Sequence, residues 1–319
     1  MLMGDIVITD GYTLNPGDLS WDAFNQFGNV ANYDRTAKGE VVERCKDAMI
    51  IITNKTPISA DLIREANNLR GIAVTATGYN IVDIAAARKR GIPVSNVPGY
   101  GTDSVAQHTF AFILELANGV GVNSQSVANG EWARSDDFCY TKTALIEIAG
   151  KTLGIIGYGT IGRRVAEIAR VFGMNVLYNS PSLMGKDPAA VEVETIFRES
   201  DFLTLHCPLT KENQGFVNKT LLAKMKSTAF LINTARGQLI NETDLRDALR
   251  EGILTGAALD VLSSEPPPAD HPLIGLPNCI ITPHNAWCSF EARQRIMTTT
   301  IDNVRAMLNG EPVNVVNGG

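Results

Sequence analysis

The chain has little of what marks secreted, metal-binding, nucleic-acid-binding or membrane proteins. Its five cysteines are scattered over 319 residues without C-x-x-C spacing, which favours a reducing cytosol over a disulfide framework or a zinc site. Arg and Lys (28) are outnumbered by Asp and Glu (34), and no dense basic run is present, so no nucleic-acid partner is expected. No apolar run reaches the length of a membrane span. The first residues, MLMGDIVITDGY, are interrupted by Asp5 and predict a strand rather than a signal peptide. We therefore expect a cytoplasmic protein.

Apolar runs alternate with helical patterns along the whole chain, which predicts an α/β fold with parallel sheets. Strands are predicted at 5–9, 48–52, 72–75, 94–97, 152–156, 175–178, 202–206, 229–233, 256–260 and 279–281. Helices are predicted at 60–67, 82–89, 103–118, 163–172, 192–198, 243–250 and 289–308. Ser59 and Asn241 are the expected N-caps of two of these helices.

The length of 319 residues is comfortable for two domains. The apolar helix at 103–118 could bridge them, and the last helix could return to the first domain. We predict two doubly wound domains, with a dinucleotide-binding Rossmann domain (103–284) inserted into a flavodoxin-like substrate domain (1–102 and 285–319). A cleft between them is the expected ligand site.

The segment TLGIIGYGTIG, from Thr152 to Gly162, carries the most informative motif. Its apolar run ends at Gly157, and Gly159 and Gly162 complete a G-x-G-x-x-G pattern between a predicted strand and a predicted helix. Gly157 allows a tight turn, Gly159 lets the backbone approach a pyrophosphate, and Gly162 lets the helix pack closely on the strand. Amides at the helix N-terminus would face the phosphates. An ordinary glycine turn is the alternative, but the flanking elements favour a dinucleotide site.

Three segments follow predicted strands of the second domain, at the edge where parallel sheets bind ligands. INTARG contains Arg236, whose guanidinium can hold a carboxylate through two hydrogen bonds. DVLSSEP offers Asp260 and Glu265, and TPHNAW offers His284. A carboxylate beside an imidazole fixes its tautomer and suits it to donate a proton to a developing alkoxide. Alternatively, these side chains lie in loops without a chemical role.

The other three histidines have weaker claims to chemistry. His108 lies within the helix predicted at 103–118 and His271 in the loop PPPADHP, so we expect a structural or solvated role for both. His206 ends a strand beside Cys207 and either lines the cofactor cleft or is structural.

Several motifs together resemble one family. GYGTIG, NTARGQLINE, GAALDVLSSEPP and ITPHNAW in the second half, and ATGYNIVDIAAARKRGIPVSNVPGYGTDSVAQHT in the first, are similar in order and spacing to the D-isomer-specific 2-hydroxyacid dehydrogenases. The similarity covers essentially the whole chain. ATGYNIVD, NVPGYGTDSVAQ and HNAW resemble most the glycerate dehydrogenase (hydroxypyruvate reductase) branch of that family.

The resemblance implies a mechanism for these residues. His284 would be the acid/base that protonates the C2 oxygen as hydride arrives from the nicotinamide, and Glu265 would hold His284 and keep it protonated. Arg236 would bind the substrate carboxylate and the C2 carbonyl, while the backbone amides of Gly78 and Tyr79 would take the remaining carboxylate oxygens. No metal is needed in this scheme, because arginine and imidazolium supply the electrophilic assistance.

The resemblance also implies a cofactor site for NAD(H) or NADP(H). Asp260 would reach the nicotinamide carboxamide. The other expected cofactor-binding residues are Thr77, Gly157, Gly159, Thr160, Ile161, Gly162, Ser180, Pro208, Thr234 and Ala235.

Two positions depart from the family pattern. Ser180, with Asn179 before it, stands where NAD enzymes carry an acidic residue that binds the adenosine ribose hydroxyls. A carboxylate would repel a 2′-phosphate, so its absence leaves the choice between NAD and NADP open; Lys186 is the nearest cation, and Ser182 adds a donor. Trp287 stands where many relatives carry a smaller residue after the catalytic histidine. It either narrows the pocket for a small substrate or packs at the domain junction.

The predicted function is reduction of hydroxypyruvate or glyoxylate by an NAD(P)-dependent oxidoreductase. The alternatives are a dehydrogenase for another 2-keto acid and a dinucleotide-sensing binding protein of the same fold. The helix at 103–118 is apolar on too many faces to face solvent, so it must be buried in the core or in a partner. Together with the resemblance, this predicts a homodimer.

Overall fold

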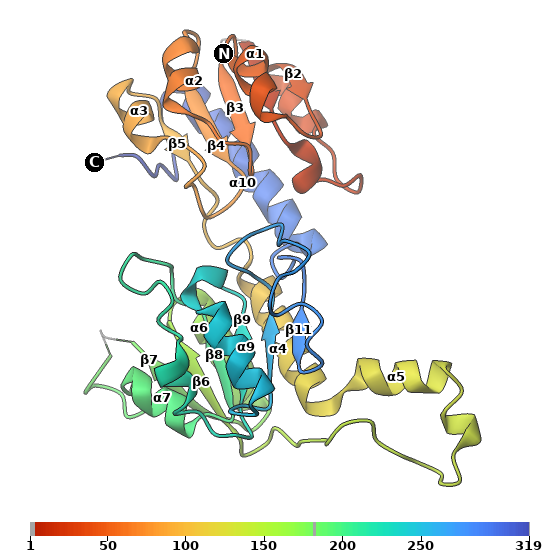
Figure 1. The fold of residues 1–319 in the computed structure, drawn as a ribbon. Helices are drawn as coiled ribbons and strands as arrows, with labels where there is room; N and C mark the ends of the chain where they lie inside the picture. Colours follow the sequence, from red (N-terminus) through yellow and green to blue (C-terminus); the bar gives the residue numbers. More distant parts are fainter. Residues whose placement is uncertain (1–3, 181–182, 319) are drawn as a thin grey trace. The chain divides into compact units, whose positions relative to one another are not determined.

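The computed structural model describes residues 4–180 and 183–318 and divides them into two compact units. The first unit contains the described residues up to Tyr100 together with those from Cys288 onward, and the second runs from Gly101 to Trp287. The helix that ends the chain thus belongs to the same unit as its first strand (Figure 1).

The first unit is built on a five-stranded parallel sheet with the strand order β2-β1-β3-β4-β5. The strands are β1 (Gly4–Ile8), β2 (Gly28–Asn32), β3 (Ile50–Thr53), β4 (Gly71–Val74) and β5 (Val94–Ser95). Strands β3 and β4 are buried at every residue, as expected for parallel strands covered on both faces.

Four α-helices cover this sheet: α1 (Val41–Cys45), α2 (Ala60–Glu65), α3 (Ile84–Lys89) and α10 (Phe290–Leu308). Three 3₁₀ turns join them, η1 (Gly11–Thr13), η2 (Asp22–Phe27) and η3 (Lys38–Glu40). Residues of α1, α2 and α3 share one apolar core with the strands. Helix α10 packs closely on β4, since a Cβ on Gly71 would lie 2.4 Å from the sulfur of Met307.

The second unit has a six-stranded parallel sheet in the order β11-β10-β9-β8-β6-β7. The strands are β6 (Thr152–Ile156), β7 (Asn175–Asn179), β8 (Phe202–Leu205), β9 (Phe230–Asn233), β10 (Gly256–Leu259) and β11 (Cys279–Ile281). The chain passes from β7 across β6 to β8, so the strand order reverses between β6 and β8. Such a switch point is where open α/β sheets bind ligands.

Helices cover both faces of this sheet, except for α5 (Val120–Ala128) and the 3₁₀ turn η4 (Trp132–Arg134), which lie on a projecting arm (Figure 1). The others are α4 (Thr102–Asn118), α6 (Thr160–Val171), α7 (Val193–Glu199), α8 (Lys219–Leu222) and α9 (Glu242–Arg250), with the 3₁₀ turn η5 (Gly237–Leu239). One apolar core joins α4 and α6 to the sheet, and the other joins α7, α8 and α9. The two layers give the doubly wound arrangement.

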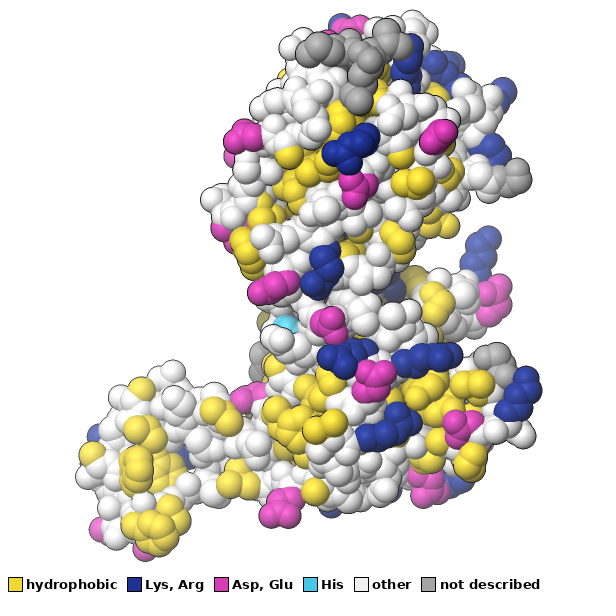
Figure 2. Space-filling view, turned by 180° about the vertical axis from the view of Figure 1, so that it is seen from behind, with side chains coloured by type: hydrophobic (Ala, Val, Ile, Leu, Met, Phe, Trp, Pro, Cys, Tyr) yellow, Lys and Arg dark blue, Asp and Glu magenta, His cyan; other side chains and the backbone are white. Residues whose placement is uncertain are grey.

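An arm formed by residues 119–146 extends from the body of the second unit and contains α5 and η4 (Figure 1). It is held mainly by its own contacts. The Ser126 hydroxyl lies 2.6 Å from the Tyr140 hydroxyl, and Lys142 pairs with Glu131 at 2.7 Å. Several large apolar side chains on the arm remain in solvent, and Figure 2 shows them grouped on the lobe at the lower left.

The α/β class and the two parallel sheets confirm the prediction from sequence. Both predicted N-caps are present: Ser59 Oγ accepts from Leu62 N at 3.3 Å, and Asn241 Oδ1 accepts from Asp244 N at 3.2 Å. The helix predicted at 82–89 begins instead at Ile84, because the Asp83 carboxylate caps it.

Other limits were also wrong in detail. The helix predicted at 163–172 begins earlier, at Thr160, directly after the glycine turn. The strand predicted at 94–97 ends at Ser95. Strand β2, with the sequence GNVAN, and helix α5, with VGVNSQSVA, were not predicted, since neither has a clear apolar period.

Candidate active site

The glycine-rich turn after β6 lies at the switch point of the second sheet. Gly157 has φ +97°, a conformation that favours glycine, and a Cβ there would lie 2.4 Å from the backbone nitrogen of Cys207 after β8. A Cβ on Gly162 would lie 2.2 Å from the Gly157 oxygen, so the start of α6 packs tightly on the turn. Gly159 differs, because a Cβ there would meet no atom within 4 Å. Two glycines are thus required by packing and the third faces open space.

These features fit a dinucleotide. The open surface over Gly159 adjoins the N-terminus of α6, a helix of 12 residues whose first residue is the exposed Thr160. Backbone amides at such an end favour phosphate oxygens. The side chain of Ile161 instead packs against the core, which leaves its backbone amide as the group able to meet a ligand.

His206 follows β8, on the other side of the switch point from β6, and it is neutral. Its backbone nitrogen donates to the Ile156 carbonyl at 2.7 Å, and its Nε2 lies 3.0 Å from Thr204 Oγ1. Burial lowers the pKa of His206 to about 3, so this imidazole brings no charge to the turn near neutral pH. Burial also raises the pKa of the neighbouring Cys207 thiol, which keeps it protonated.

Arg236, Glu265 and His284 follow three neighbouring strands of the same sheet. Arg236 comes after β9, Glu265 after β10 and His284 after β11, and these strands are adjacent in the order β11-β10-β9. Because the strands are parallel, all three residues are delivered to the carboxyl edge of the sheet.

His284 and Glu265 form a direct pair. The Nδ1 atom of His284 lies 2.6 Å from Oε2 of Glu265, and the other carboxylate oxygen accepts from the Leu262 amide at 3.0 Å. Both side chains are partly exposed, 29% for His284 and 36% for Glu265, which leaves them accessible to a ligand. Since Nδ1 is engaged, Nε2 is the ring atom that can exchange a proton with substrate.

The backbone of His284 adopts φ +52°, which is uncommon outside glycine. Asp260 holds it there: the His284 amide donates to the Asp260 carbonyl at 2.8 Å. The buried Asp260 carboxylate accepts from Thr282 Oγ1 at 2.6 Å and from the amides of Asn285 and Ala286 at 2.9 Å each. The backbone carbonyl and the side-chain carboxylate of Asp260 thus both hold the turn that carries His284. Its expected contact with a nicotinamide carboxamide stays a prediction.

Helix α4 adds to this network a histidine for which the sequence predicted only a structural or solvated role. His108 Nε2 lies 3.1 Å from Thr282 Oγ1 and 3.8 Å from Asp260 Oδ1. Burial lowers the pKa of His108, and the nearby Asp260 opposes that shift. No sequence pattern indicates this contact, because it depends on how α4 packs against the strand ends.

Arg236 is exposed and stands on a rigid turn. The side chain of the buried Asn233 accepts from the Ala235 amide at 2.9 Å and donates to the Arg236 carbonyl at 2.8 Å. The guanidinium donates to the Ala235 carbonyl, and within residues 4–180 and 183–318 it forms no ion pair with a carboxylate. Thr234 is half-buried beside α4, with its hydroxyl 3.3 Å from that of Thr109.

The remaining predicted cofactor residues are dispersed around the same edge. Pro208 is exposed after β8, and its carbonyl accepts from Asn213. Ser180 follows β7 directly and is half-buried, and Asn179 donates to the Val191 carbonyl at 3.1 Å. Ser182 lies outside the described residues.

In the first unit, Thr77, Gly78 and Tyr79 lie in the loop after β4. Thr77 donates from its hydroxyl to the Val97 carbonyl at 3.0 Å and accepts at its own carbonyl from Asn96 Nδ2 at 2.7 Å. Gly78 is exposed and Tyr79 half-buried. Their role in holding a substrate carboxylate stays a prediction, as does substrate contact by Trp287, which lies within the second unit beside Gly101.

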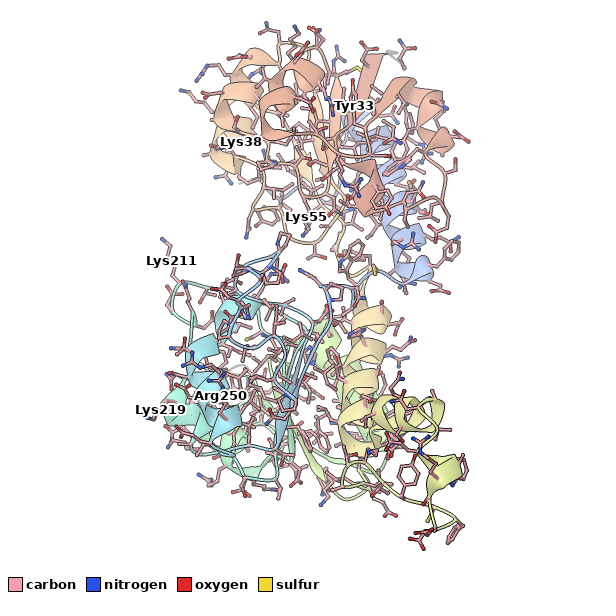
Figure 3. All side chains as sticks on the ribbon, turned by 45° about the vertical axis from the view of Figure 1, so that its right-hand side comes forward. Tyr33, Lys38, Lys55, Lys211, Lys219 and Arg250 are labelled. Atoms are coloured by element: carbon pink, nitrogen blue, oxygen red, sulfur yellow. The ribbon has the colours of Figure 1, made fainter. Side chains whose placement is uncertain are left out.

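A second loop at the same edge of the first sheet is held by a buried acid. The Asp10 carboxylate accepts from the amides of Asn54 at 2.8 Å, Lys55 at 2.5 Å and Thr56 at 2.9 Å. Figure 3 shows Lys55 at the tip of this loop. The loop backbone is therefore fixed by hydrogen bonds to Asp10.

Comparison with known proteins identifies the family. The model for the NAD-binding domain of the D-isomer specific 2-hydroxyacid dehydrogenases matches residues 110–286. A hydroxypyruvate reductase from Blautia hydrogenotrophica is 46% identical over 98% of this chain and 99% of its own length. The chain belongs to the D-isomer specific 2-hydroxyacid dehydrogenase family. It is therefore an oxidoreductase of that family with an NAD-binding domain.

This dehydrogenase is also similar to a second curated relative and to a solved structure. A glycerate dehydrogenase from Methylorubrum extorquens is 42% identical over 87% of this chain and 88% of its own length. A solved acyclic imino acid reductase, in complex with NADPH and D-Arg, superposes with TM-score 0.84 at 31% identity and covers 98% of this chain and 99% of its own.

Two kinds of feature are absent from the described part of the chain. No helix there is both long and apolar enough to cross a membrane. No group of three or more His, Cys, Asp or Glu side chains there could hold a metal ion.

The three glycine environments lead to a test of the dinucleotide turn. We expect Gly162→Ala to lower the stability of the fold by about 1–3 kcal/mol, because the added methyl group collides with the Gly157 oxygen. Gly159→Ala should leave the melting temperature unchanged but weaken NADH binding measured by fluorescence titration, because its methyl group fills the open surface. Gly39→Ala, where a Cβ also meets no atom within 4 Å, is the control for both measurements. Tight NADH binding by Gly159→Ala would contradict the assignment.

Proposed function

We propose that this dehydrogenase reduces hydroxypyruvate or glyoxylate, with NADH or NADPH as the reductant, to D-glycerate or glycolate. The observation that carries the proposal is the 2.6 Å pair of His284 and Glu265 beside the strand that delivers Arg236. The names of the relatives from Blautia hydrogenotrophica and Methylorubrum extorquens support this substrate class. The first unit is proposed as the substrate domain.

In this proposal, Arg236 binds the substrate. Its exposed guanidinium can offer two parallel N–H donors to a carboxylate, with a further donor for the C2 carbonyl oxygen. The two hydrogen bonds of the Asn233 side chain fix the backbone turn that carries Arg236. Binding by Arg236 also draws electron density from the C2 carbonyl and prepares it for reduction.

His284 then supplies the proton. With Nδ1 held by Glu265, the proton on Nε2 passes to the C2 oxygen as that oxygen becomes an alkoxide. The nicotinamide, when bound, supplies the hydride to C2. In the reverse direction His284 takes the proton from the hydroxyl group, and the Glu265 carboxylate stabilises the imidazolium that forms.

Two alternatives are kept. A different 2-keto acid would use the same three residues. The space beside the Trp287 ring would then determine which keto-acid side chain fits. A dinucleotide-sensing binding protein would retain the glycine turn but would not need Arg236, Glu265 and His284 together. The presence of all three favours turnover. Oxidation of NADH and NADPH, measured in parallel with hydroxypyruvate, glyoxylate and pyruvate, separates the candidates.

The cofactor is proposed to be NAD(H) or NADP(H). Ser180, directly after β7, can donate to a ribose hydroxyl or to a phosphate oxygen, and it does not repel a 2′-phosphate as a carboxylate would. The relative solved with NADPH is compatible with use of the phosphorylated form.

A cytoplasmic location, favoured by five scattered cysteines, is part of the proposal.

A second copy of this chain is the proposed partner. Phe138 (89% exposed), Val120 (62%) and Trp132 (52%) leave large apolar surfaces on the arm in solvent. A groove of about 420 Å³ between α4 and α6 is lined by the buried Phe110 and by Phe172, which is 40% exposed and adds to the apolar surface of the same unit. Exposed large apolar side chains favour association, and a two-fold pairing of the second units would cover them.

Replacement of the proposed acid/base tests the reaction. We expect His284→Ala to bind NADH normally but to lower kcat for hydroxypyruvate by roughly 10²- to 10⁴-fold, because only the reacting oxygen uses this group. Arg236→Lys should raise KM as well, since a point ammonium cannot form the two-donor fork. Arg246→Lys, on α9, is the control for the second variant. Retention of a tenth of wild-type kcat in His284→Ala, or an unchanged KM in Arg236→Lys, would count against the assigned role.

The cofactor proposal is tested at Ser180. We expect kcat/KM with NADPH to lie within roughly tenfold of that with NADH, which is about 1.4 kcal/mol. Ser180→Asp should depress the use of NADPH sharply through like-charge repulsion and leave NADH use equal or better. Ser227→Asp adds the same charge before β9 and serves as the control. Equal effects of Ser180→Asp on both cofactors would mean that this residue does not approach the ribose.

A measurement of the oligomeric state tests whether the apolar side chains of the arm belong to a dimer interface. Light scattering should give a dimer for the wild-type protein at micromolar concentration, and Phe138→Ser combined with Val120→Lys should shift it toward monomer. Val313→Ser, which removes an exposed apolar side chain of the first unit, should leave the dimer intact. A stable wild-type monomer would refute the proposal.

A further inference from the structure

A second His–Glu pair lies in the same unit as the catalytic one. His271 Nε2 lies 3.1 Å from Glu242 Oε2, and the two side chains are only 4% and 13% exposed. Burial of a carboxylate costs desolvation free energy unless hydrogen bonds compensate it. The stability of the pair therefore depends on the groups that donate to Glu242. No sequence pattern predicts this pair, because His271 lies in a proline-rich loop and Glu242 at the polar start of a helix.

Glu242 is not needed as a helix cap. It is the first residue of α9, and Asn241 already caps that helix by accepting from Asp244. The Glu242 carboxylate instead accepts from the Ser263 amide at 2.7 Å and from the Ser263 hydroxyl at 2.5 Å. With His271, three donors thus converge on one carboxylate; two belong to Ser263, and all three lie outside α9.

The hydrogen bonds assign the tautomer of His271. Its Nδ1 accepts from the Leu273 amide at 3.4 Å, so the neutral ring must carry its proton on Nε2, where it donates to Glu242. Each nitrogen therefore has a defined partner. The ring ties the loop that follows Glu265 to the start of α9.

Ser263 is the point where this pair meets the catalytic segment. It lies between Leu262, whose amide donates to Glu265, and Glu265 itself. The Ser263 carbonyl accepts from Gln238 Nε2 at 2.8 Å. A Cβ on Gly237 would lie 2.0 Å from the carbonyl carbon of Leu262, so the segment packs directly on the residue that follows Arg236.

We propose that Glu242 and His271 are positioning residues that fix Ser263 so that the Glu265 carboxylate faces His284. The inference rests on the proposed function, since it deepens the role of the catalytic pair. Neither residue touches the reacting atoms. Their effect passes through the backbone of Leu262 and Ser263 to Glu265, and then to the orientation of the imidazole.

The positioning can be observed without turnover. The chain has only four histidines, so the side-chain ¹H–¹⁵N spectrum of the full-length protein can be assigned completely. We expect a hydrogen-bonded Nδ1–H signal from His284 and an Nε2–H signal from His271 in the wild-type protein. Glu242→Gln should abolish the His284 signal. Loss of that signal supports the proposal whichever keto acid is reduced, whereas a wild-type protein that reduces none refutes only the proposed function.

Kinetics provide the second readout. Glu242→Gln and His271→Leu should lower kcat on the order of ten- to a hundredfold with little change in NADH affinity, because a displaced general acid costs rate rather than cofactor binding. His271→Gln, whose amide can donate to Glu242, should restore most of the rate. In a Glu265→Gln background, Glu242→Gln should cost less than about twofold, because its effect requires Glu265.

A matched control separates positioning from general destabilisation. Asp201 also accepts a backbone amide, that of Thr152 at 2.8 Å, and pairs with Lys226 at 2.9 Å, but it lies at the amino end of β8. Asp201→Asn should keep kcat and the His284 signal. If Glu242→Gln fails to fold, Ser263→Ala removes only the hydroxyl contact and should give a smaller change of the same kind. An unchanged His284 signal, additive effects with Glu265→Gln, or an equal loss in Asp201→Asn would each overturn the proposal.

Discussion

The candidate active site depends most on the buried carboxylate of Asp260. It stands directly after β10 and accepts three hydrogen bonds from the turn after β11, while its carbonyl accepts from the His284 amide. These bonds hold His284 at a positive φ that its side chain would otherwise disfavour. Loss of the carboxylate would leave the buried Ala286 amide without this acceptor, at about 1–3 kcal/mol, and would also remove the acceptor of the Asn285 amide. The position of the imidazole therefore rests on a residue that is itself almost inaccessible.

The geometry of a parallel sheet explains why distant sequence segments converge here. Each strand ends at the same edge, so residues separated by some tens of positions in sequence become neighbours once β9, β10 and β11 pair in register. The hydrogen bonds then refine what the sheet brings near. Asn233 shapes the turn before Arg236, and Glu265 contacts both its own loop and His284.

Sequence patterns predicted the parts of this arrangement that local physics decides. The buried strands, the caps at Ser59 and Asn241 and the two parallel sheets follow from apolar periods and from side chains that satisfy helix amides. The packing reasons suggested for Gly157 and Gly162 agree with the short distances that a Cβ would make. Strand β2 was missed because its stability comes from pairing with β1 and not from its own composition.

Tertiary contacts decided the rest. The positive φ of His284 has no signature in TPHNAW, and His108 shows only that it lies on an apolar helix. His271 was placed in a structural or solvated class, and nothing in PPPADHP indicates that its ring pairs with Glu242, 29 residues earlier. Such contacts depend on how loops fold over the edge of a sheet, which periodicity does not encode.

Both units solve the same physical problem with the same device. In the first unit, the buried Asp10 follows β1 and accepts the amides of Asn54, Lys55 and Thr56, as Asp260 accepts those of its own turn. A loop at the carboxyl edge has backbone donors that no neighbouring strand can satisfy, and an acid at the end of an adjacent strand supplies the acceptor. Because the buried acids satisfy the backbone, the exposed side chains of the same loops need not stabilise them. His284 can therefore remain accessible while the backbone that carries it stays ordered, and the buried side chain of Asn233 does the same for the turn that carries Arg236.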